Sequence, residues 1–445
     1  MQSDPYQMRL HRRSLAERLV AMGPSPAAAA LAQFQRDLAD ALLAGEAALA
    51  GCNGSFRSQI KNHVRLLRSF GDAIAWLHMH PHAIRQFRKG GLPGGQHLSA
   101  QREALEGVLT LVDEIATTGI VAIATDLTTD LRLGDIIVCD DYAAPTIIEC
   151  KRRLPRDNSI LLGRVGRQVA RLRSTADYLE TGSAEFPGES LSRLCIETDI
   201  SVEPEWSLVE SAIKAAVDRG GEVVQRLGNG QVLWVSLGEK ELPHELTEHI
   251  KSFKLPVVGV HTRYLDDDSP LMPPPLAWSI SAAARLQLLE DDISLTVILD
   301  AERFEEFANE CGSKLVVNES LTISVDCAGE TYVVSDRFIG DCLYNFQPIE
   351  AQVRLILDFV ERCRAMSITP VVGTPPPRVF GPPPRVHHVR SIEEGHLMLQ
   401  RDPGASDVVL MSGDLACAPS LEMRPRLILW ETGPPTDSVS SDSDS

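Results

Sequence analysis

The stretch LRLGDIIVCDDYAAPTIIECKRRLPR, Leu131 to Arg156, contains two short apolar runs joined by a turn. Such runs, bounded by turn residues, are typical of buried β-strands. Charged residues nevertheless stand at their ends, with Asp135 opening the first run and Glu149 and Lys151 closing the second. Residues two apart in a strand share a face, so Glu149 and Lys151 are expected to project together. If the two runs pair through the connection 140–145, Asp135 lies near Glu149.

Two carboxylates and one ammonium group on a single patch indicate a particular kind of chemistry. Adjacent carboxylates repel each other and need a counter-ion, and hard oxygen ligands of this kind suit Mg²⁺. A lysine beside the metal can position a water molecule or stabilise developing negative charge. The combination suits hydrolysis of a phosphodiester with Mg²⁺ as cofactor, for which Mn²⁺ can substitute.

The arrangement resembles the restriction endonuclease-like, or PD-(D/E)XK, nuclease superfamily. The resemblance covers about residues 99–200 and rests on an acid that starts one strand and a Glu-x-Lys on the next, although Gly134 stands where the written motif has proline. It also rests on the order helix, three strands, helix, strand, which the apolar patterns predict at about 99–117, 120–124, 135–139, 146–150, 158–179 and 191–196. The implied fold is a restriction endonuclease-like α/β core.

The resemblance assigns roles to four residues of the opening stretch. It implies that Asp135 and Glu149 ligate the metal and that the main-chain carbonyl of Cys150 adds a ligand. It implies that Lys151 activates the attacking water. DNA is the favoured substrate, because most of the superfamily cuts DNA, and restriction or defence against phage is the biological setting that we expect.

Two further positions enter through the resemblance. Family members often draw another acid from the helix before the first strand, where Glu103, Glu106 and Glu114 are candidates and Glu103 is preferred. Some branches carry a glutamine on the following helix, paired with a tyrosine four residues later. Gln168 occupies that place here, but Leu172 stands at the tyrosine position.

The net charge of −18 at first argues against a nucleic-acid partner, because polyanions are bound by local positive charge. The charge is unevenly distributed, however. Residues 1–180 carry 22 Lys and Arg against 19 Asp and Glu, whereas residues 181–445 carry 21 against 42. The stretch 151–173 holds eight basic residues and one acid. Either a solvated face or a phosphate-binding surface explains such a run, and the candidate phosphate contacts are Arg152, Arg153, Arg156, Arg164, Arg167 and Arg171.

Composition shifts predict several segments along the chain. They are an N-terminal helical region (1–56), a nuclease-like domain (57–200), an acidic mixed α/β domain (201–369), a Pro-rich linker (370–386), a short C-terminal element (387–431) and a disordered acidic tail (432–445). The acidic region is expected to mediate self-association or to bind a protein partner. No membrane span or signal peptide is apparent, which predicts a cytoplasmic protein without a membrane partner.

Two other interpretations remain. His78, His80 and His82 carry potential metal ligands, but Pro81 between them interrupts the helical geometry and favours an ordinary helix end.

One acid-x-Lys tripeptide is expected by chance in a chain of this composition, so the information lies in its conjunction with Asp135. The alternative function is a non-catalytic nucleic-acid-binding or scaffold protein on a nuclease-like fold.

Overall fold

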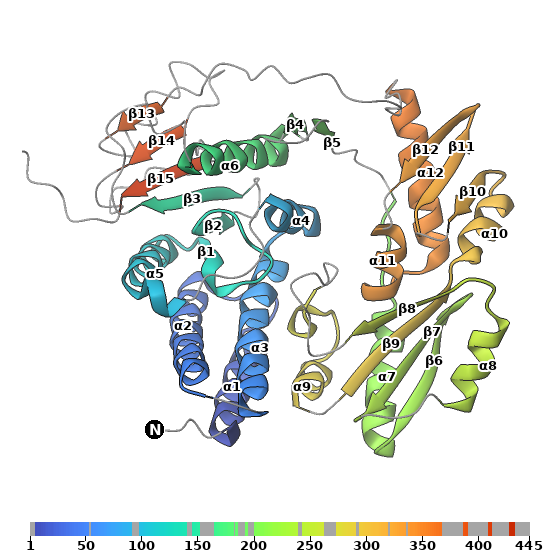
Figure 1. Ribbon diagram of the computed structural model, residues 1–445, viewed down its shortest axis with the longest axis horizontal. Helices are drawn as coiled ribbons and strands as arrows, with labels where there is room; N and C mark the ends of the chain where they lie inside the picture. The colour runs from blue at the N-terminus through green and yellow to red at the C-terminus, as the bar shows by residue number, and fades with distance from the viewer. Residues whose placement is uncertain are drawn as a thin grey trace, which may run out of the picture. The chain divides into compact units, whose positions relative to one another are not determined.

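The computed structural model has a mixed α/β architecture that divides into two compact units (Figure 1). Unit 1 comprises residues 1–23, 53–66 and 195–375, and unit 2 comprises residues 24–52, 67–194 and 376–445. The structure describes residues 5–52, 55–90, 98–139, 145–151, 164–181, 183–185, 192–194, 200–238, 243–261, 273–290, 293–318, 321–334, 337–366, 386–389, 408–411 and 427–431.

Unit 2 is built on a six-stranded sheet in the order β1-β2-β3-β15-β14-β13 (Figure 1). The first three strands pair antiparallel, whereas β3, β15, β14 and β13 are mutually parallel. Its elements are α2 (Ala28–Ala50), the part of α3 (Ser55–His78) from Leu67, α4 (Pro81–Gly90), η1 (Leu98–Gln101), α5 (Arg102–Thr117), β1 (Val121–Ala124), η2 (Thr125–Leu127), β2 (Ile136–Cys139), β3 (Thr146–Lys151), α6 (Arg164–Thr181), β4 (Ser183–Glu185), β5 (Ser192–Leu194), β13 (Val386–Val389), β14 (Val408–Met411) and β15 (Leu427–Glu431).

Helices cover this sheet because each presents one apolar stripe to it. Helices α2 and α5 pack against β1, and α6 packs against β3 and β15. Gln35 of α2 is buried and binds the β1 backbone twice, donating to the carbonyl of Ala122 at 2.8 Å and accepting from the N–H of Ala124 at 2.8 Å. Helix α2, which was predicted to belong to a separate N-terminal region, is therefore part of unit 2.

The predicted order of helix and three strands is found as α5, β1, β2 and β3, with α6 next. The fourth strand differs. A strand does form at Ser192–Leu194, but it pairs with β4 in a separate two-stranded sheet. The place beside β3 is taken by β15, which lies within the segment predicted as a short C-terminal element. A strand from the far end of the chain thus supplies the parallel neighbour, and residues 195–375 of unit 1 are inserted between β5 and β13.

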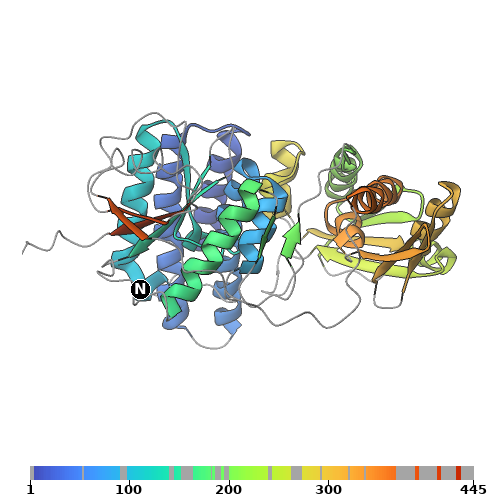
Figure 2. The same cartoon turned by 90° about the horizontal axis from the view of Figure 1, so that it is seen from above.

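Unit 1 contains most of the predicted acidic α/β domain, with α1 and the start of α3 added to it. Its larger sheet is antiparallel in the order β6-β7-β9-β8, and a second antiparallel sheet has the order β10-β11-β12 (Figure 1). Figure 2 gives a second view of these strands, which are coloured from light green to orange. The remaining elements are α1 (Pro5–Ala21), α7 (Trp206–Arg219), β6 (Glu222–Gly228), β7 (Gln231–Leu237), α8 (His244–Ser252), β8 (Pro256–His261), η4 (Pro275–Ala277), α9 (Ala282–Glu290), β9 (Ile293–Asp300), α10 (Glu302–Glu310), β10 (Lys314–Val317), β11 (Ile323–Cys327), β12 (Glu330–Val334), α11 (Arg337–Tyr344) and α12 (Ile349–Ala365).

The core of unit 1 joins both sheets to α7, α10, α11 and α12 in one apolar cluster. The β6–β7 hairpin turns at Gly230, whose φ of +80° favours glycine. His261 is buried in this core and its ring nitrogen Nε2 lies 2.8 Å from the carbonyl of Leu343. Among the described residues, no helix is long and apolar enough to cross a membrane.

Candidate functional site

The candidate site lies where β2 begins and β3 ends, in unit 2. The two strands pair antiparallel with Ile136 opposite Ile148. Just before this pair, the N–H of Asp135 donates to the carbonyl of Ile148 at 2.9 Å, so Asp135 and Ile136 both lie against Ile148. The predicted pairing of the two apolar runs is confirmed. It holds Asp135 against the segment of β3 that contains Glu149.

The Asp135 carboxylate is held by the strand that carries Glu149. Its oxygen Oδ2 accepts a hydrogen bond of 2.5 Å from the main-chain N–H of Cys150. Hydrogen bonds from backbone N–H groups to a carboxylate favour its ionised form and are stronger than neutral ones. The side chain of Asp135 is therefore oriented toward β3 by a backbone group that does not depend on side-chain rotamers.

Glycine at position 134 is required by this turn into β2. Gly134 has a φ of +77°, a conformation that L side chains rarely adopt. A Cβ atom built on it would lie 2.6 Å from Cγ2 of Ile147 and 3.4 Å from the carbonyl oxygen of Ile148. The departure from the proline of the written motif thus has a physical reason, since this chain needs a residue without a Cβ immediately before Asp135.

Glu149 is almost completely buried, with 1% of its surface exposed. Burial of a carboxylate is costly unless hydrogen bonds or a positive charge compensate it. Its chain neighbours are the buried Ile148 and the half-buried Cys150. Glu149 is therefore an acidic residue buried within an otherwise apolar strand.

Strand β15 pairs with the edge of β3 that faces away from β2. In the parallel register, Leu429 is the partner of Glu149 and Glu431 is the partner of Lys151. Lys151 is the last residue of β3. The sequence offered no signal for this neighbour, because the short apolar run at 427–430 is compatible with many partners.

A second layer of polar residues fixes the loop between β1 and β2. Thr125 donates two hydrogen bonds to the turn before β2: its N–H donates to the carbonyl of Asp135 at 3.0 Å, and its hydroxyl donates to the carbonyl of Gly134 at 2.6 Å. Further along the loop, the Asp72 carboxylate of α3 accepts from the N–H groups of Thr129 and Asp130 at 2.7 and 2.9 Å, and from the Thr129 hydroxyl at 2.6 Å. The loop that leads to Asp135 is therefore anchored to a helix.

Asp72 and Asp130 form a pair of buried acids in this second layer. Burial, reinforced by the neighbouring Asp130 carboxylate, raises the pKa of Asp72 to about 7. Burial also raises the pKa of Asp130, against the opposing influence of Arg88, whose guanidinium lies 3.5 Å from its carboxylate. Trp76 donates its indole N–H to Asp130 at 3.1 Å. Neither acid of this pair was predicted as a site residue; the available signal was an acid at a buried position of the amphipathic helix α3.

The other predicted site residues are placed only in part. Glu103 is exposed in the first turn of α5, and of the two alternative candidates Glu114 is exposed on the same helix and Glu106 pairs with Arg36 at 2.8 Å. Arg171 is exposed on α6, and Arg164, Arg167 and Gln168 belong to the same helix. The side chain of Lys151 and the predicted phosphate contacts Arg152, Arg153 and Arg156 lie outside the described residues.

The candidate metal ligands at this end of β3 are the carboxylates of Asp135 and Glu149. Within the described parts of the chain, no three His, Cys, Asp or Glu side chains gather into a group that could hold a metal ion. Asp135, Glu149 and Glu103 therefore do not form a three-ligand group among the described residues. Mg²⁺ commonly binds proteins through about one or two carboxylates and keeps several waters. The donor set of Asp135, Glu149 and the Cys150 carbonyl is compatible with that cation.

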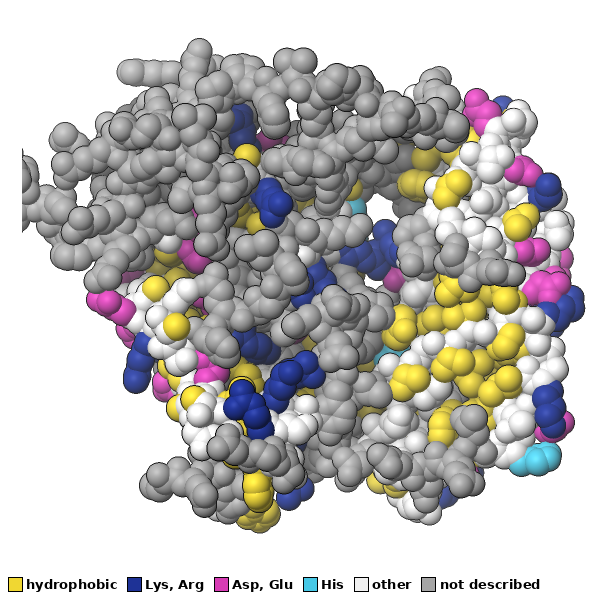
Figure 3. Space-filling view, viewed as in Figure 1, with side chains coloured by type: hydrophobic (Ala, Val, Ile, Leu, Met, Phe, Trp, Pro, Cys, Tyr) yellow, Lys and Arg dark blue, Asp and Glu magenta, His cyan; other side chains and the backbone are white. Residues whose placement is uncertain are grey.

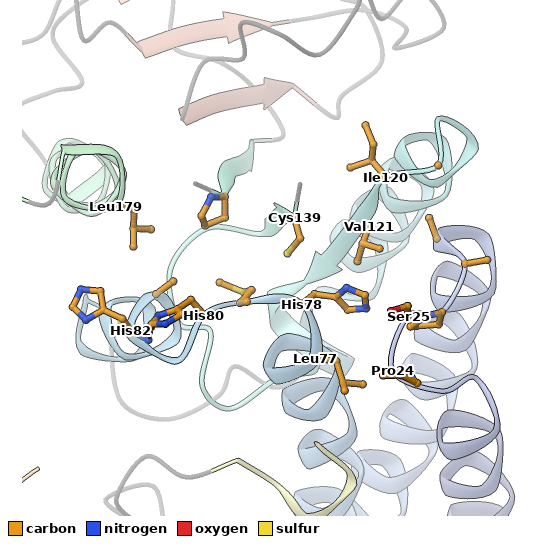
Figure 4. Close-up of a pocket in the computed structure, with 17 residues that line it drawn as sticks. Pro24, Ser25, Leu77, His78, His80, His82, Ile120, Val121, Cys139 and Leu179 are labelled. Carbon is orange, nitrogen blue, oxygen red and sulfur yellow. Dashed lines mark hydrogen bonds between the residues drawn. The ribbon is translucent and has the colours of Figure 1, made fainter. Parts of the chain in front are cut away.

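A separate cavity of about 720 Å³ lies in unit 2 near Cys139, at the opposite end of β2 from Asp135 (Figure 4). His78, His80 and His82 line it, as do residues at the start of α2 and of β1. As predicted, the helix is interrupted among these histidines: α3 ends at His78 and α4 begins at Pro81. Neither Asp135 nor Glu149 lines the cavity, so it is distinct from the candidate site.

Comparison of the chain with family models, with curated proteins and with solved structures found no match.

Proposed function

We propose that the chain is a metal-dependent nuclease that hydrolyses phosphodiester bonds at Asp135, Glu149 and Lys151, with DNA as the favoured substrate. The observation that carries the proposal is the pairing of β2 with β3, in which Asp135 forms hydrogen bonds with Ile148 and Cys150, the residues on either side of Glu149. Lys151 lies two residues beyond Glu149 on β3. The resemblance to the restriction endonuclease-like superfamily was based on those residues. The mixed sheet, with α5 before it and α6 packed on β3 and β15, supports the proposal.

The proposed roles follow from the chemistry of each group. Asp135 and Glu149, with the main-chain carbonyl of Cys150, would hold Mg²⁺ or Mn²⁺. A bound divalent cation lowers the pKa of water and offsets negative charge on the phosphate. The Cys150 N–H keeps the Asp135 carboxylate oriented, and the Lys151 ammonium orients the attacking water and stabilises the charge that develops in the transition state. Glu103 and Gln168 remain proposed accessory residues.

The biological setting that we propose is restriction or defence against phage. A nuclease unit interrupted by a large acidic unit suits an enzyme whose activity depends on a second event, such as self-association or binding of a protein partner. The acidic unit would repel nucleic acid over most of its surface, so its proposed role is in that control.

A non-catalytic nucleic-acid-binding protein on the same fold is the alternative. It predicts binding without cleavage. The buried carboxylate of Glu149 favours the enzyme, because a site that only binds phosphates gains nothing from an acid placed beside another acid, which repels the ligand.

A substrate panel tests the proposal. Purified protein is incubated with supercoiled plasmid, linear duplex, single-stranded DNA and RNA, each with Mg²⁺, with Mn²⁺ and with excess chelator. We expect cleavage of at least one DNA substrate that requires the divalent cation and is abolished by chelator. Binding of these substrates without cleavage under any condition would support the alternative function.

A further inference from the structure

Helix α1 and the first half of α3 carry an unusual concentration of positive charge in unit 1. Residues 5–21 and 55–66, here called the α1–α3 surface, contain seven Lys and Arg residues and one acid, Glu17. The rest of unit 1 belongs to the acidic part of the chain, in which residues 181–445 carry 21 basic and 42 acidic residues. Lys and Arg side chains gather over α3 and α1 in the space-filling view (Figure 3).

The basic residues are arranged in rows along the two helices. On α1, Arg9 and Arg13 are both exposed and lie four residues apart, which places them on one face. On α3, Arg57, Lys61 and Arg65 follow each other at intervals of four, and the first two of them are exposed. Among the described residues, neither Arg9 nor Lys61 forms an ion pair. Two rows of cations with spacing of this kind match a chain of phosphates better than a single compact anion.

Exposed aromatic rings lie within the same surface. Tyr6 is 56% exposed and stands at the start of the Arg9–Arg13 row, and Phe56 is 54% exposed beside Arg57. Among the described residues, Tyr6 and Phe56 are the two aromatic residues in the set of exposed large hydrophobic side chains. Aromatic rings next to cations form stacking platforms for unpaired bases, whereas the bases of a duplex are already stacked on one another.

The opposite sides of these helices are already occupied by protein. Leu15, Ala16 and Leu19 of α1 are buried, and α1 packs against α9 and η4. Ile60 and Val64 of α3 are buried as well. A membrane-binding helix inserts its apolar stripe into lipid, but in α1 and α3 these apolar residues are already packed against protein. This favours nucleic acid over a lipid surface as the polyanion that binds here.

The two helices are close enough to affect one another electrostatically. Burial, with Arg12 and His11 of α1 nearby, lowers the pKa of His63 on α3 to about 4. His63 is consequently neutral at physiological pH, and the charge on the surface comes from arginine and lysine.

We propose that the α1–α3 surface binds single-stranded nucleic acid, with Arg9, Arg13, Arg57 and Lys61 contacting phosphates and Tyr6 and Phe56 stacking on bases. The inference assigns a binding surface outside the candidate nuclease site, and it rests on the proposed function for the choice of nucleic acid among polyanions. The surface contains neither Asp135 nor Glu149, so binding and cleavage can be tested separately.

Fluorescence anisotropy with a labelled single-stranded oligonucleotide, its duplex and anionic phospholipid vesicles tests the inference on the full chain. The variant Arg9→Ala/Arg13→Ala/Lys61→Ala removes three positive charges from the surface. The matched control is Lys251→Ala/Lys254→Ala/Lys314→Ala, which removes three exposed charges that pair with Glu248, Glu302 and Asp326 elsewhere in unit 1. Thermal unfolding of both variants establishes that they are folded.

We expect the surface variant to bind the single strand at least about tenfold more weakly than the control, with a salt slope lower by about 2. Tyr6→Ala/Phe56→Ala should weaken single-strand binding by a similar factor and leave duplex binding unchanged. Equal binding by the two triple variants, or tighter binding to vesicles than to the oligonucleotide, would overturn the inference. Binding by wild type without any cleavage would leave it standing while the proposed nuclease function fails.

Discussion

The main-chain N–H of Cys150 lies 2.5 Å from carboxylate oxygen Oδ2 of Asp135 and donates a hydrogen bond to it. This bond connects the residue that opens β2 to the residue that follows Glu149 on β3. A displacement of one strand along the other would move Asp135 away from Glu149, because the ladder sets both positions. The geometry of the proposed site is therefore sensitive to changes in the turn before Asp135 and in the strands around β3.

Gly134→Ala should destabilise unit 2 more than a comparable substitution elsewhere. Gly119 also has a positive φ of +82°, but a Cβ there would meet no atom within 4 Å. We expect Gly119→Ala to cost about 1 kcal/mol from backbone strain. Gly134→Ala should cost at least about 1 kcal/mol more, because its Cβ would clash with Ile147. Chemical unfolding measures both, and equal losses would contradict the tight turn.

Gln35→Leu should destabilise the fold by about 2–4 kcal/mol. The substitution leaves the buried carbonyl of Ala122 and the N–H of Ala124 without their side-chain partner. The matched control is Gln33→Leu on the same helix, because Gln33 is exposed and its amide binds only Asp37 among the described contacts. Unfolding free energies of the two variants give the comparison. A loss no larger than that of the control would show that α2 is not held to β1 in this way.

The stability of unit 1 should fall in mild acid because of His261. Burial lowers its pKa to about 4, below the ordinary value of 6.5. The unfolded chain therefore binds a proton that the folded chain excludes, and stability is lost as pH falls from 6.5 toward 4. Between pH 7.5 and 5 this group should account for about 2 kcal/mol.

His261→Gln isolates that contribution, because glutamine does not titrate. The variant should be less stable than wild type at pH 7.5, since it loses the ring that stacks on Phe346 at 4.7 Å between centroids. The difference between the two proteins should shrink by about 2 kcal/mol at pH 5. Unfolding curves at both pH values measure the change, and a constant difference would show that His261 is not excluded from protonation in the fold.

Truncation after residue 426 should unfold unit 2, whereas truncation after residue 431 should be tolerated. The first removes β15 and leaves β3 without its parallel neighbour, so five paired positions of the ladder are lost. The second retains the whole of β15 and removes only the acidic tail. Circular dichroism and limited proteolysis of the two proteins provide the measurement. Equal stability would mean that β15 does not contribute to the sheet.

The sequence predicted the local parts of the fold and missed the distant ones. The β2–β3 pairing follows from two apolar runs joined by a short connection, and the helices follow from their amphipathic spacing. The pairing of β15 with β3 joins segments on opposite sides of an inserted unit, and no local pattern specifies the partner of a four-residue apolar run. For the same reason the sequence suggested contiguous domains, whereas each unit is assembled from three segments.

The candidate site was predictable to a similar extent. The proximity of Asp135 to Glu149 was predicted from the pairing of two apolar runs joined by a short connection. The structure contains that pairing, and Asp135 forms hydrogen bonds with Ile148 and Cys150 on either side of Glu149. The hydrogen bond from Cys150 depends on the exact register at the end of the ladder, which periodicity does not determine. The support from Asp72 and Thr125 depends on a loop conformation without regular spacing, so the sequence carried no pattern for it.

Cleavage of DNA by Asp135→Asn measures whether the Asp135 carboxylate acts in the proposed nuclease site. The substitution keeps the size of the side chain and an oxygen that can accept from the Cys150 N–H, but it removes the negative charge. The matched control is Glu245→Gln, which removes an exposed acid from α8 of unit 1. With Mg²⁺ and the substrate that wild type cuts, we predict a loss of cleavage of at least about a hundredfold for Asp135→Asn, with DNA binding retained and the control fully active. Undiminished cleavage by Asp135→Asn would show that the Asp135 carboxylate takes no part in hydrolysis.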